Sequence, residues 1–257
     1  MKNLKNKTVL ITGGTSGIGL SCAHTFAEAG CNIIITGRRE DRLEKISKEL
    51  ASKYRIQCAA IKMDVRDFEN VKQGIDSITP KQKKIDILIN NAGLSRGINK
   101  IQDGLLEDWN EMIDTNVKGI LHVSKCVIPL MLENKTGHII NIGSIAGQEV
   151  YPGGNIYSAS KFAVDGITKS MRVDLLETPI KVSTVDPGLV KTEFSIVRFH
   201  GDEEKAEAPY KGIEPLSPED VADAVLYIAT RKDNVNIAQI VMFPKAQAGT
   251  TFINRGK

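Results

Sequence analysis

A short apolar run followed at once by a glycine-rich segment restricts the fold more than any other feature of the chain. Residues 8–12 (TVLIT) are β-branched and almost entirely apolar, which is typical of a strand buried on both faces. Residues 13–19 (GGTSGIG) follow, and helical spacing then continues through Ala23 and Phe26 to Gly30, a natural helix stop. A buried strand, a tight turn and a helix in this order favour an α/β fold with a parallel sheet.

The same alternation of strands and helices continues along the whole chain. Further strands are predicted at residues 32–36, 57–63, 85–90, 138–142, 181–185 and 238–243. Further helices are predicted at residues 42–53, 68–78, 106–132, 156–176 and 218–230. The long helix at 106–132 is expected to break near Gly119 or Pro129, and Ser217 is expected to cap the last helix. This pattern predicts a Rossmann-type, doubly wound parallel sheet with helices on both faces and ligands at the carboxyl ends of the strands.

Composition and patterning predict one soluble domain. The 257 residues, of which 41% are hydrophobic and 25% charged, can form one large core, and no linker-like segment or internal repeat divides them. The first residues lack the apolar region of a signal peptide, and no apolar run reaches the length of a membrane span. We therefore expect a single domain over residues 1–257 that is cytoplasmic and does not bind a membrane.

Charge and cysteine spacing argue against two further classes of protein. The net charge is only +3, and the basic cluster KQKK at residues 81–84 is too short to indicate a nucleic-acid surface. The four cysteines lie far apart, and no two form a CxxC pair. We expect them to be reduced thiols, with neither disulfides nor a metal site.

The glycine-rich turn is the first candidate binding site. Gly13, Gly17 and Gly19 would let the backbone approach a pyrophosphate, and the helix N-terminus offers free N–H groups. The spacing is GxxxGxG, which differs from the GxGxxG of other dinucleotide sites. A glycine-rich turn can be only a turn, but its place after a buried strand favours a nucleotide. The other residues of the predicted site in this turn are Thr15, Ser16 and Ile18.

The residues after the second predicted strand indicate which nucleotide binds. NAD sites have an acidic residue here for the adenosine ribose, but this chain has Thr36, Gly37, Arg38 and Arg39. A guanidinium suits a phosphate because its planar fork donates two charge-assisted hydrogen bonds. We therefore predict NADP rather than NAD, with Arg38 and Arg39 on the 2′-phosphate. The alternative is that both arginines are exposed charges at the start of a helix.

Tyr157 and Lys161 form the candidate catalytic pair. Four residues apart on a helix, they would lie on one face, one turn from each other. An ammonium near a phenol favours the phenolate, so the tyrosine would exchange protons well below its usual pKa of about 10. Alone, such a pair is usually no more than two surface residues, and its role depends on the rest of the chain.

Several motifs together resemble the short-chain dehydrogenase/reductase family, from about residue 7 to residue 243. They are TGGTSGIG at 12–19, NNAG at 90–93, Asn116, Ser144, YSASK at 157–161 and DPG at 186–188. The resemblance implies that Tyr157 is the general acid/base, that Lys161 lowers its pKa and binds the nicotinamide ribose, and that Ser144 hydrogen-bonds the substrate oxygen. Asn116 would hold a water that connects Lys161 with solvent; the alternative, a bond to a neighbouring backbone, is compatible with this role.

The resemblance also implies further contacts with the dinucleotide. They are Asp64 and Val65 at the adenine, Asn91 along the adenosine, and Pro187, Gly188, Val190 and Thr192 on the nicotinamide side. The evidence for these residues is weaker, because turns need aspartate, proline and glycine in any case.

Substrate choice in this family depends on the segment after the DPG turn, here a polar lid at about residues 193–215. The chain, with GHIINIGSIAG and PGLVKTEFSIVRF, is similar to the NADP-dependent 3-hydroxy acid dehydrogenases, which oxidise serine and allo-threonine and reduce malonic semialdehyde. Arg198 in the lid is the candidate for binding the substrate carboxylate; alternatively it faces solvent or an internal glutamate. Arg96 departs from the expected apolar residue and either adds charge near the entrance or is exposed.

Two other functions remain open beside a 3-hydroxy acid dehydrogenase. One is another short-chain reductase, acting on a 3-oxoacyl thioester, a sugar or a diketone, because the fold does not fix the substrate. The other is a non-catalytic NADP-sensing protein, which would not need Ser144, Tyr157 and Lys161 together. The resemblance also implies a homotetramer in which the helices around 109–132 and 157–176 pair, while the tail at 245–257 packs on a neighbouring subunit or frays.

Overall fold

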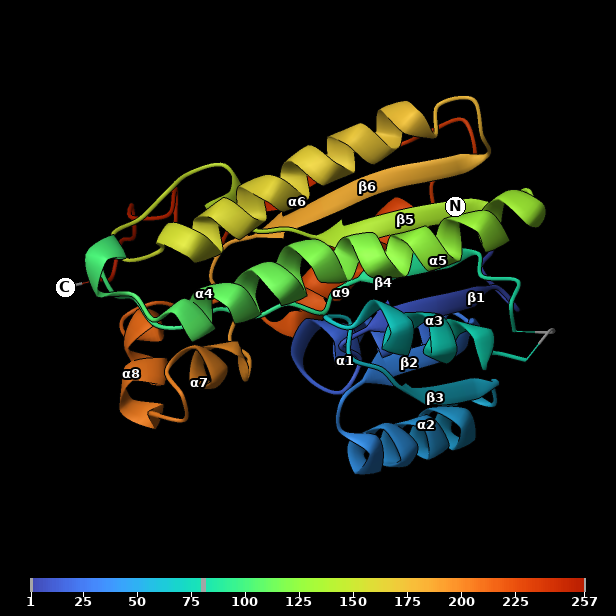
Figure 1. Ribbon diagram of the computed structural model, residues 1–257, viewed down its shortest axis with the longest axis horizontal. Helices are drawn as coiled ribbons and strands as arrows, with labels where there is room; N and C mark the ends of the chain where they lie inside the picture. The colour runs from blue at the N-terminus through green and yellow to red at the C-terminus, as the bar shows by residue number, and fades with distance from the viewer. Residues whose placement is uncertain (1, 80–81, 257) are drawn as a thin grey trace.

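A computed structural model describes residues 2–79 and 82–256 and shows these ranges arranged around a seven-stranded sheet (Figure 1). Every strand pair is parallel, and the strand order is β3-β2-β1-β4-β5-β6-β7. The strands are β1 Thr8–Thr12, β2 Asn32–Gly37, β3 Cys58–Lys62, β4 Ile87–Asn90, β5 Gly137–Ile142, β6 Ile180–Pro187 and β7 Gln239–Met242. The predicted doubly wound fold is confirmed. Lys81 of the basic cluster and Lys257 of the tail lie outside the described residues.

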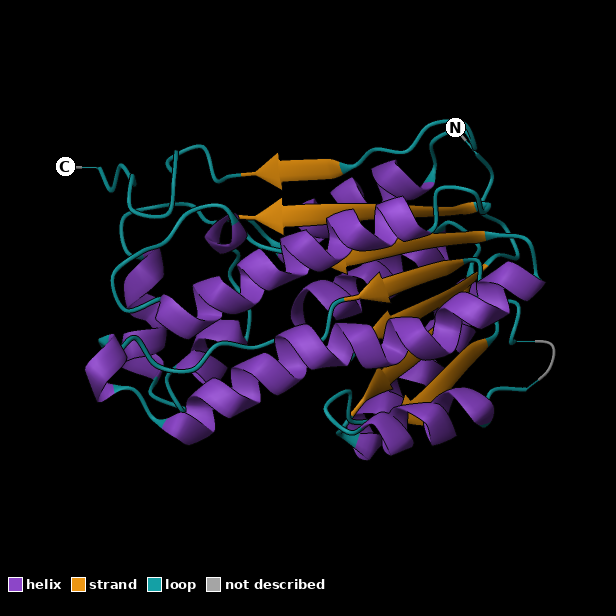
Figure 2. Ribbon diagram, turned by 45° about the horizontal axis from the view of Figure 1, so that its top comes forward, coloured by secondary structure: helices purple, strands orange, loops and turns teal. Residues whose placement is uncertain are grey.

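Helices cover both faces of this sheet (Figure 2). They are α1 Gly17–Glu28, α2 Glu40–Tyr54, α3 Phe68–Asp76, α4 Leu106–Ile113, α5 Gly119–Glu133, α6 Asn155–Asp174, α7 Phe194–Arg198, α8 Glu203–Glu207 and α9 Pro218–Ala229. The start of α9 agrees with the predicted cap, because Ser217 and Asp220 form a capping box. None of the helices within the two described ranges is long and apolar enough to cross a membrane.

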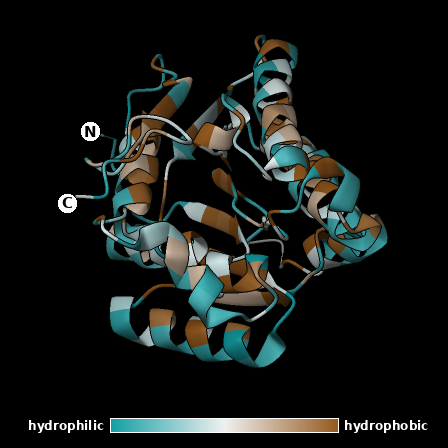
Figure 3. Cartoon of the chain, turned by 90° about the vertical axis from the view of Figure 1, so that its left-hand side faces the viewer, coloured by the Kyte–Doolittle hydropathy of each residue, from teal (hydrophilic) through white to brown (hydrophobic). Residues whose placement is uncertain are grey.

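Side-chain alternation in the strands divides the core into two layers. In β1, Val9 and Ile11 pack with Phe26 of α1, whereas Leu10 packs on the opposite face with Val127 of α5. All five side chains are fully buried, and each such side chain stabilises the fold by about 1.5–3 kcal/mol. Because both faces of β1 are covered, its side chains Val9, Leu10 and Ile11 are apolar on both faces. Figure 3, seen from the side at which the strands end, shows helices banded in hydrophobic and hydrophilic residues, as this layered core requires.

The long helix predicted at 106–132 breaks at one place only. A π-helical turn, Asp114–Lys118, separates α4 from α5, and the predicted break near Gly119 falls directly after it. A Cβ at Gly119 would lie only 2.7 Å from Val65, so glycine lets the helix approach the end of β3 closely. Pro129 lies inside α5 and does not end it. The π turn carries Asn116 into the interior, where it is almost completely buried.

The C-terminal tail contacts its own chain. Gln247 Oε1 accepts a hydrogen bond from Leu189 N at 2.9 Å, and Arg255 Nη1 donates to Lys211 O at 2.7 Å. The tail therefore lies against the segment at 193–215, which contains α7, α8 and the 3₁₀ turn Ala208–Tyr210. These contacts do not match a frayed terminus, and packing of the tail on a neighbouring subunit stays a prediction.

A buried histidine in β5 predicts how stability depends on pH. Burial, followed by the charges of Lys181 and Lys2, lowers the pKa of His138 from 6.5 to about 3. The unfolded chain therefore binds a proton near pH 6.5 that the folded chain does not accept until much lower pH. Stability from this group is complete above pH 6.5 and is lost as the pH falls below it, by about 2 kcal/mol at pH 5.

Urea unfolding of the wild type and His138→Gln at pH 7.5 and pH 5 measures this effect. The wild type is expected to lose about 2 kcal/mol more than the variant between the two pH values. An equal loss in both proteins would contradict the assignment to His138.

Candidate active site

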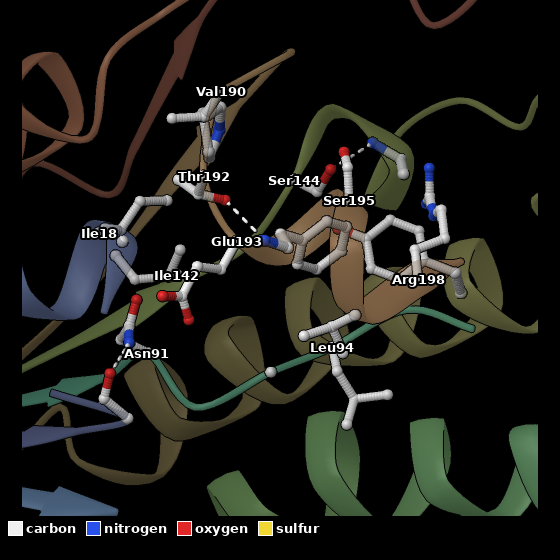
Figure 4. Close-up of a pocket in the computed structure, with 18 of the residues that line it drawn as sticks. Ile18, Asn91, Leu94, Ile142, Ser144, Val190, Thr192, Glu193, Ser195 and Arg198 are labelled. Atoms are coloured by element: carbon white, nitrogen blue, oxygen red, sulfur yellow. Dashed lines mark hydrogen bonds between the residues drawn. The ribbon is translucent and has the colours of Figure 1, made fainter. Parts of the chain in front are cut away.

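A cavity of about 640 Å³ opens at the carboxyl ends of the strands (Figure 4). β1 lies between β2 and β4, so the strand order reverses here, at the place where doubly wound sheets bind ligands. The predicted site residues that line the cavity are Gly13, Thr15, Ser16, Gly17, Ile18, Arg38, Arg39, Asp64, Val65, Asn91, Ser144, Tyr157, Lys161, Pro187, Gly188, Val190, Thr192 and Arg198. Gly19 and Asn116 do not line it.

The glycine-rich turn forms one wall of the cavity. Gly13 and Gly17 have φ values of +65° and +52°, which favour glycine and leave the backbone uncovered. Gly19 has a packing role, since a Cβ there would overlap the carbonyl of Gly13 and the side-chain amide of Asn91. Asn91 in turn donates to Thr12 O at 2.9 Å, so it ties the end of β4 to the turn.

Arg38 and Arg39 stand at the end of β2, on the rim of the same cavity. Arg39 Nη2 donates to Thr15 Oγ1 at 3.0 Å and to Ser16 Oγ at 3.3 Å, so it lies over the glycine-rich turn. Both arginines line the cavity, so they are more than exposed charges at the start of α2. Bare backbone at the turn and two guanidiniums beside it are donors of the kind that a phosphorylated dinucleotide requires.

The carboxylate of Asp64, which is predicted to meet the adenine, forms an ion pair with Arg66. Arg66 Nη2 lies 2.6 Å from Asp64 Oδ2, and Arg66 Nε lies 3.0 Å from Oδ1. Burial acts to raise the pKa of Asp64, but the hydrogen bonds and charge of Arg66 hold it below its usual range. Glu111 of α4 extends the network, because it pairs with Arg66 at 3.3 Å and with Arg38 at 3.8 Å. This end of the cavity, where the adenine is predicted to bind, therefore alternates acids and arginines.

Ser144, Tyr157 and Lys161 meet at the inner end of the cavity. Ser144 follows β5 and caps the 3₁₀ turn Ile145–Gly147, while the other two lie one turn apart in α6. Lys161 Nζ donates to Ile142 O at 2.9 Å and lies 5.9 Å from the centre of the Tyr157 ring. Two elements thus bring the three predicted catalytic side chains together.

Burial dominates the protonation of this group. It raises the pKa of Tyr157, against the opposing effects of the Arg198 cation and of a hydrogen bond with Ser144. It lowers the pKa of Lys161 to about 8, although the charge of Asp186 acts to raise it. Arg198, which the sequence did not connect with the phenol, is thus a cation that lowers the pKa of Tyr157. The predicted effect of Lys161 on Tyr157 stays a prediction.

Asn116 has a complete set of protein partners. Its Oδ1 accepts from Leu94 N at 2.8 Å, and its Nδ2 donates to Leu94 O at 2.8 Å and to Ser160 Oγ at 3.0 Å. These are the predicted bonds of a helix residue to neighbouring backbone; the predicted water between Lys161 and solvent is compatible with them and stays a prediction. Through Leu94, Asn116 fixes the segment after β4 beside Lys161.

Arg198 enters the cavity from α7 and faces Tyr157. Its Nε donates to Ser95 Oγ at 2.9 Å and its Nη2 to Tyr151 Oη at 2.6 Å. The guanidinium carbon lies 5.2 Å from the centre of the Tyr157 ring and 5.4 Å from that of Phe194. Among residues 2–79 and 82–256 it forms no ion pair, so neither a solvent-facing side chain nor an internal glutamate describes it.

Arg96 connects two elements and adds no charge to the cavity. Its Nε donates to Glu111 Oε2 at 2.7 Å, and its Nη1 donates to Val197 O at 2.6 Å. The side chain is only 17% exposed. It therefore ties α7 to α4, which matches neither of the two roles expected for it.

The segment after β6 forms the wall of the cavity that faces the glycine-rich turn. Thr192 lies against Gly17, where a Cβ would be 3.3 Å from the threonine side chain. Val190 pairs with Leu216 in an isolated bridge. Pro187 ends β6 and, like the residues that follow it, lines the cavity.

Sequence reasoning missed Ser95, which bonds the cavity residue Arg198, and Tyr151, Glu193 and Phe194, which line the cavity. The first two hold the Arg198 guanidinium. Glu193 pairs with Arg39 at 3.4 Å, and the Phe194 ring meets that of Tyr157 edge-on at 5.6 Å. The available signals were slight: a polar residue just after NNAGL, an aromatic residue before PGG, and an acid next to an aromatic in TEF.

The cysteines and possible metal ligands are separate from this site. Cys22, Cys31, Cys58 and Cys126 are free thiols. Over the described parts of the chain, no group of three or more histidine, cysteine or acidic side chains is placed to hold a metal ion.

Known proteins resemble this chain over nearly its full length. NADP-dependent 3-hydroxy acid dehydrogenase of Schizosaccharomyces pombe is 44% identical over 256 residues, 99% of each chain. Sulfoacetaldehyde reductase 2 of Chromohalobacter salexigens is 42% identical over 245 residues, 95% of this chain and 96% of that one. The solved closed form of serine dehydrogenase complexed with NADP+ has a TM-score of 0.90 and 41% identity, over 94% of this chain and 96% of that chain.

A family model gives the same result for a large part of the sequence. The model described as short chain dehydrogenase matches residues 7–202, which is well over half of the chain. The match includes the glycine-rich turn, Ser144, Tyr157 and Lys161. Together with the seven-stranded parallel sheet and the full-length relatives, it shows that the chain belongs to the short-chain dehydrogenase family.

Proposed function

We propose that this protein is an NADP-dependent oxidoreductase of small 3-hydroxy acids. Its substrates are serine, allo-threonine, 3-hydroxypropionate or 3-hydroxyisobutyrate, with malonic semialdehyde in the reverse direction. One observation supports this choice above all: the Arg198 guanidinium, bonded only to neutral hydroxyls among the described residues, faces the phenol of Tyr157. A carboxylate bound by this cation would hold a nearby carbinol at the proton-transfer group.

The proposed mechanism assigns one task to each side chain. Tyr157 Oη accepts the hydroxyl proton during oxidation and returns it during reduction. Ser144 Oγ hydrogen-bonds the substrate oxygen and stabilises the charge that develops there. Lys161 and Arg198 supply the positive charge that a buried phenolate needs, since burial alone opposes it.

NADP would lie along the cavity, from Arg38 and Arg39 past the glycine-rich turn to Lys161. When bound, it supplies the redox chemistry, the exchange of a hydride with the carbon that bears the hydroxyl. Arg38 and Arg39 would hold the 2′-phosphate, and the uncovered backbone of Gly13 and Gly17 would face the pyrophosphate. The relatives named for NADP and the serine dehydrogenase complexed with NADP+ support this cofactor.

Other substrates of the same family are the second candidate. The similarity to sulfoacetaldehyde reductase 2 favours an anionic substrate in general, because a guanidinium accepts a sulfonate as well as a carboxylate. A 3-oxoacyl thioester, a sugar or a diketone gives Arg198 no small anion to bind. A non-catalytic NADP-sensing protein would leave the converging Ser144, Tyr157 and Lys161 without a use.

We also propose a cytoplasmic homotetramer whose substrate lid is the segment at 193–215. Exposed apolar side chains on α5 and α6 support the pairing of these helices between subunits: Leu121, Leu132, Phe162 and Val173. The free cysteines support a reducing compartment. The lid assignment is supported by Arg198 and Phe194, which reach Tyr157 from this segment.

Arg198→Ala tests the substrate proposal. Loss of a charged hydrogen bond to the carboxylate is expected to lower kcat/KM for 3-hydroxypropionate by about 10- to 100-fold. The variant also removes a cation beside Tyr157, so activity on any substrate will change. The decisive measurement is therefore a ratio, kcat/KM for 3-hydroxypropionate divided by kcat/KM for 1,3-propanediol, which lacks the carboxylate.

The ratio is expected to fall in Arg198→Ala and to recover in part in Arg198→Lys, which keeps the charge. If the ratio stays within about threefold of the wild type, Arg198 does not bind the carboxylate, since such a change is below the energy of a charged hydrogen bond.

Replacement of Arg38 and Arg39 by alanine tests the cofactor proposal. The double variant is expected to weaken NADP binding by about 100-fold or more, while NAD binding changes little, because only NADP carries the 2′-phosphate. Titration of protein fluorescence with each dinucleotide measures both constants without turnover. Arg55→Ala, an exposed arginine after α2, is the control. An unchanged preference between NADP and NAD would show that the two arginines do not read the phosphate.

A further inference from the structure

Asp186, the first residue of the DPG turn, is a buried carboxylate with four polar or charged neighbours. It is only 4% exposed. Its Oδ2 accepts from Gln148 Nε2 at 3.0 Å and from Gln239 Nε2 at 2.5 Å, and its Oδ1 accepts from Thr184 Oγ1 at 2.7 Å. Burial raises the pKa of Asp186 above its usual range, although the hydrogen bonds from Gln239, Thr184 and Gln148 and the charge of Lys161 act to lower it. These four neighbours therefore offset part of the cost of burying the carboxylate.

Asp186 contacts the loop that carries Ser144 at two points. Gln148 directly follows the 3₁₀ turn that Ser144 caps, and its side-chain amide is bound by Asp186. At the other end of the loop, a Cβ on Gly143 would overlap the Asp186 carboxylate, so the backbone there lies directly on it. Gly143 N also bonds Val185 O at 2.9 Å. Asp186 therefore holds the loop on both sides of the serine.

The same carboxylate acts on Lys161, whose environment is otherwise uncharged. Lys161 Nζ bonds Ile142 O, one residue before Gly143. The segment after β4 brings the backbone of Gly93 near the ammonium. Gly147, in the 3₁₀ turn after β5, lies against the backbone of Lys161. Asp186 from β6 and Tyr157 from α6 are the titratable groups that face Lys161 among the described residues.

We propose that Asp186 is a positioning residue, which fixes the loop of Ser144 through Gln148 and Gly143 and places a negative charge beside the Ile142–Gly143 backbone that Lys161 Nζ contacts. The proposal rests on the roles proposed above for Ser144, Tyr157 and Lys161. It adds a residue that touches neither substrate nor cofactor. Its carboxylate supplies both the hydrogen-bond acceptor for the loop and the counter-charge for the lysine.

Asp186→Asn removes the negative charge of this side chain but keeps its shape. It is expected to lower kcat for hydroxy-acid oxidation by about 10-fold or more, as small displacements of catalytic groups do, with less than about twofold change in NADP affinity. Loss of the negative charge favours loss of the Lys161 proton. The alkaline limb of the kcat–pH profile is therefore expected to move to lower pH, by about one unit.

Gln148→Met tests the contact with the loop without changing the charge of Asp186. It removes the bond to the loop but leaves the carboxylate, so kcat is expected to fall while the alkaline limb stays in place. Asp174→Asn is the control, because Asp174 lies on the same helix as Lys161 but 13 residues away, about 20 Å along the axis. It is expected to change neither kcat nor the profile.

The proposal is overturned if Asp186→Asn keeps kcat within about threefold of the wild type, or if its alkaline limb does not move. If that variant fails to fold, Gln148→Met decides, and an unchanged kcat overturns the proposal. Tyr157→Phe is assayed beside them. If the wild type is no more active than Tyr157→Phe on every substrate, the proposed function fails; if only the Asp186 results fail, the proposed function stands.

Discussion

Because every strand of the sheet is parallel, all carboxyl ends lie at one edge, and the rest of the site depends on this constraint. Residues from Gly13 to Arg198, 185 positions apart in sequence, meet in one cavity for this reason. The core that fixes the strands is apolar on both faces, so the edge is the place where polar groups can gather. Reversal of the strand order between β2 and β4 opens the cavity there.

Placing polar groups at this edge has a cost, because several of them are buried. Burial favours the neutral forms of both Tyr157 and Lys161, whereas proton transfer here needs a phenolate at Tyr157 and an ammonium at Lys161. The structure offsets this cost with two separate charges: Arg198 favours the phenolate of Tyr157, and Asp186 favours the ammonium of Lys161. Since the two pairs share one small volume, removal of any member would change the protonation of the others.

The sequence was sufficient for the features that depend on local pattern. Apolar β-branched runs, helical spacing and the glycine-rich turn predicted the layers, and Arg38 and Arg39 marked the end of β2. It was insufficient for contacts between distant segments, such as Arg66 with Glu111 or Ser95 with Arg198, because tertiary pairing leaves no period in the sequence. The break at Asp114–Lys118 was placed nearby, yet a π turn could not be foreseen from residue types alone.

The short segment from Thr192 to Arg198 explains how one fold can serve many substrates. At its start, Glu193 pairs with Arg39 and Arg42 on the rim where the 2′-phosphate is proposed to bind. At its end, Arg198 faces the phenol of the proton-transfer residue. A change at the far end of α7 therefore alters the group that faces Tyr157, while the end next to the glycine-rich turn keeps its contacts. Tyr157 and Lys161 of α6 and Asp186 of β6, the buried titratable groups, need not change.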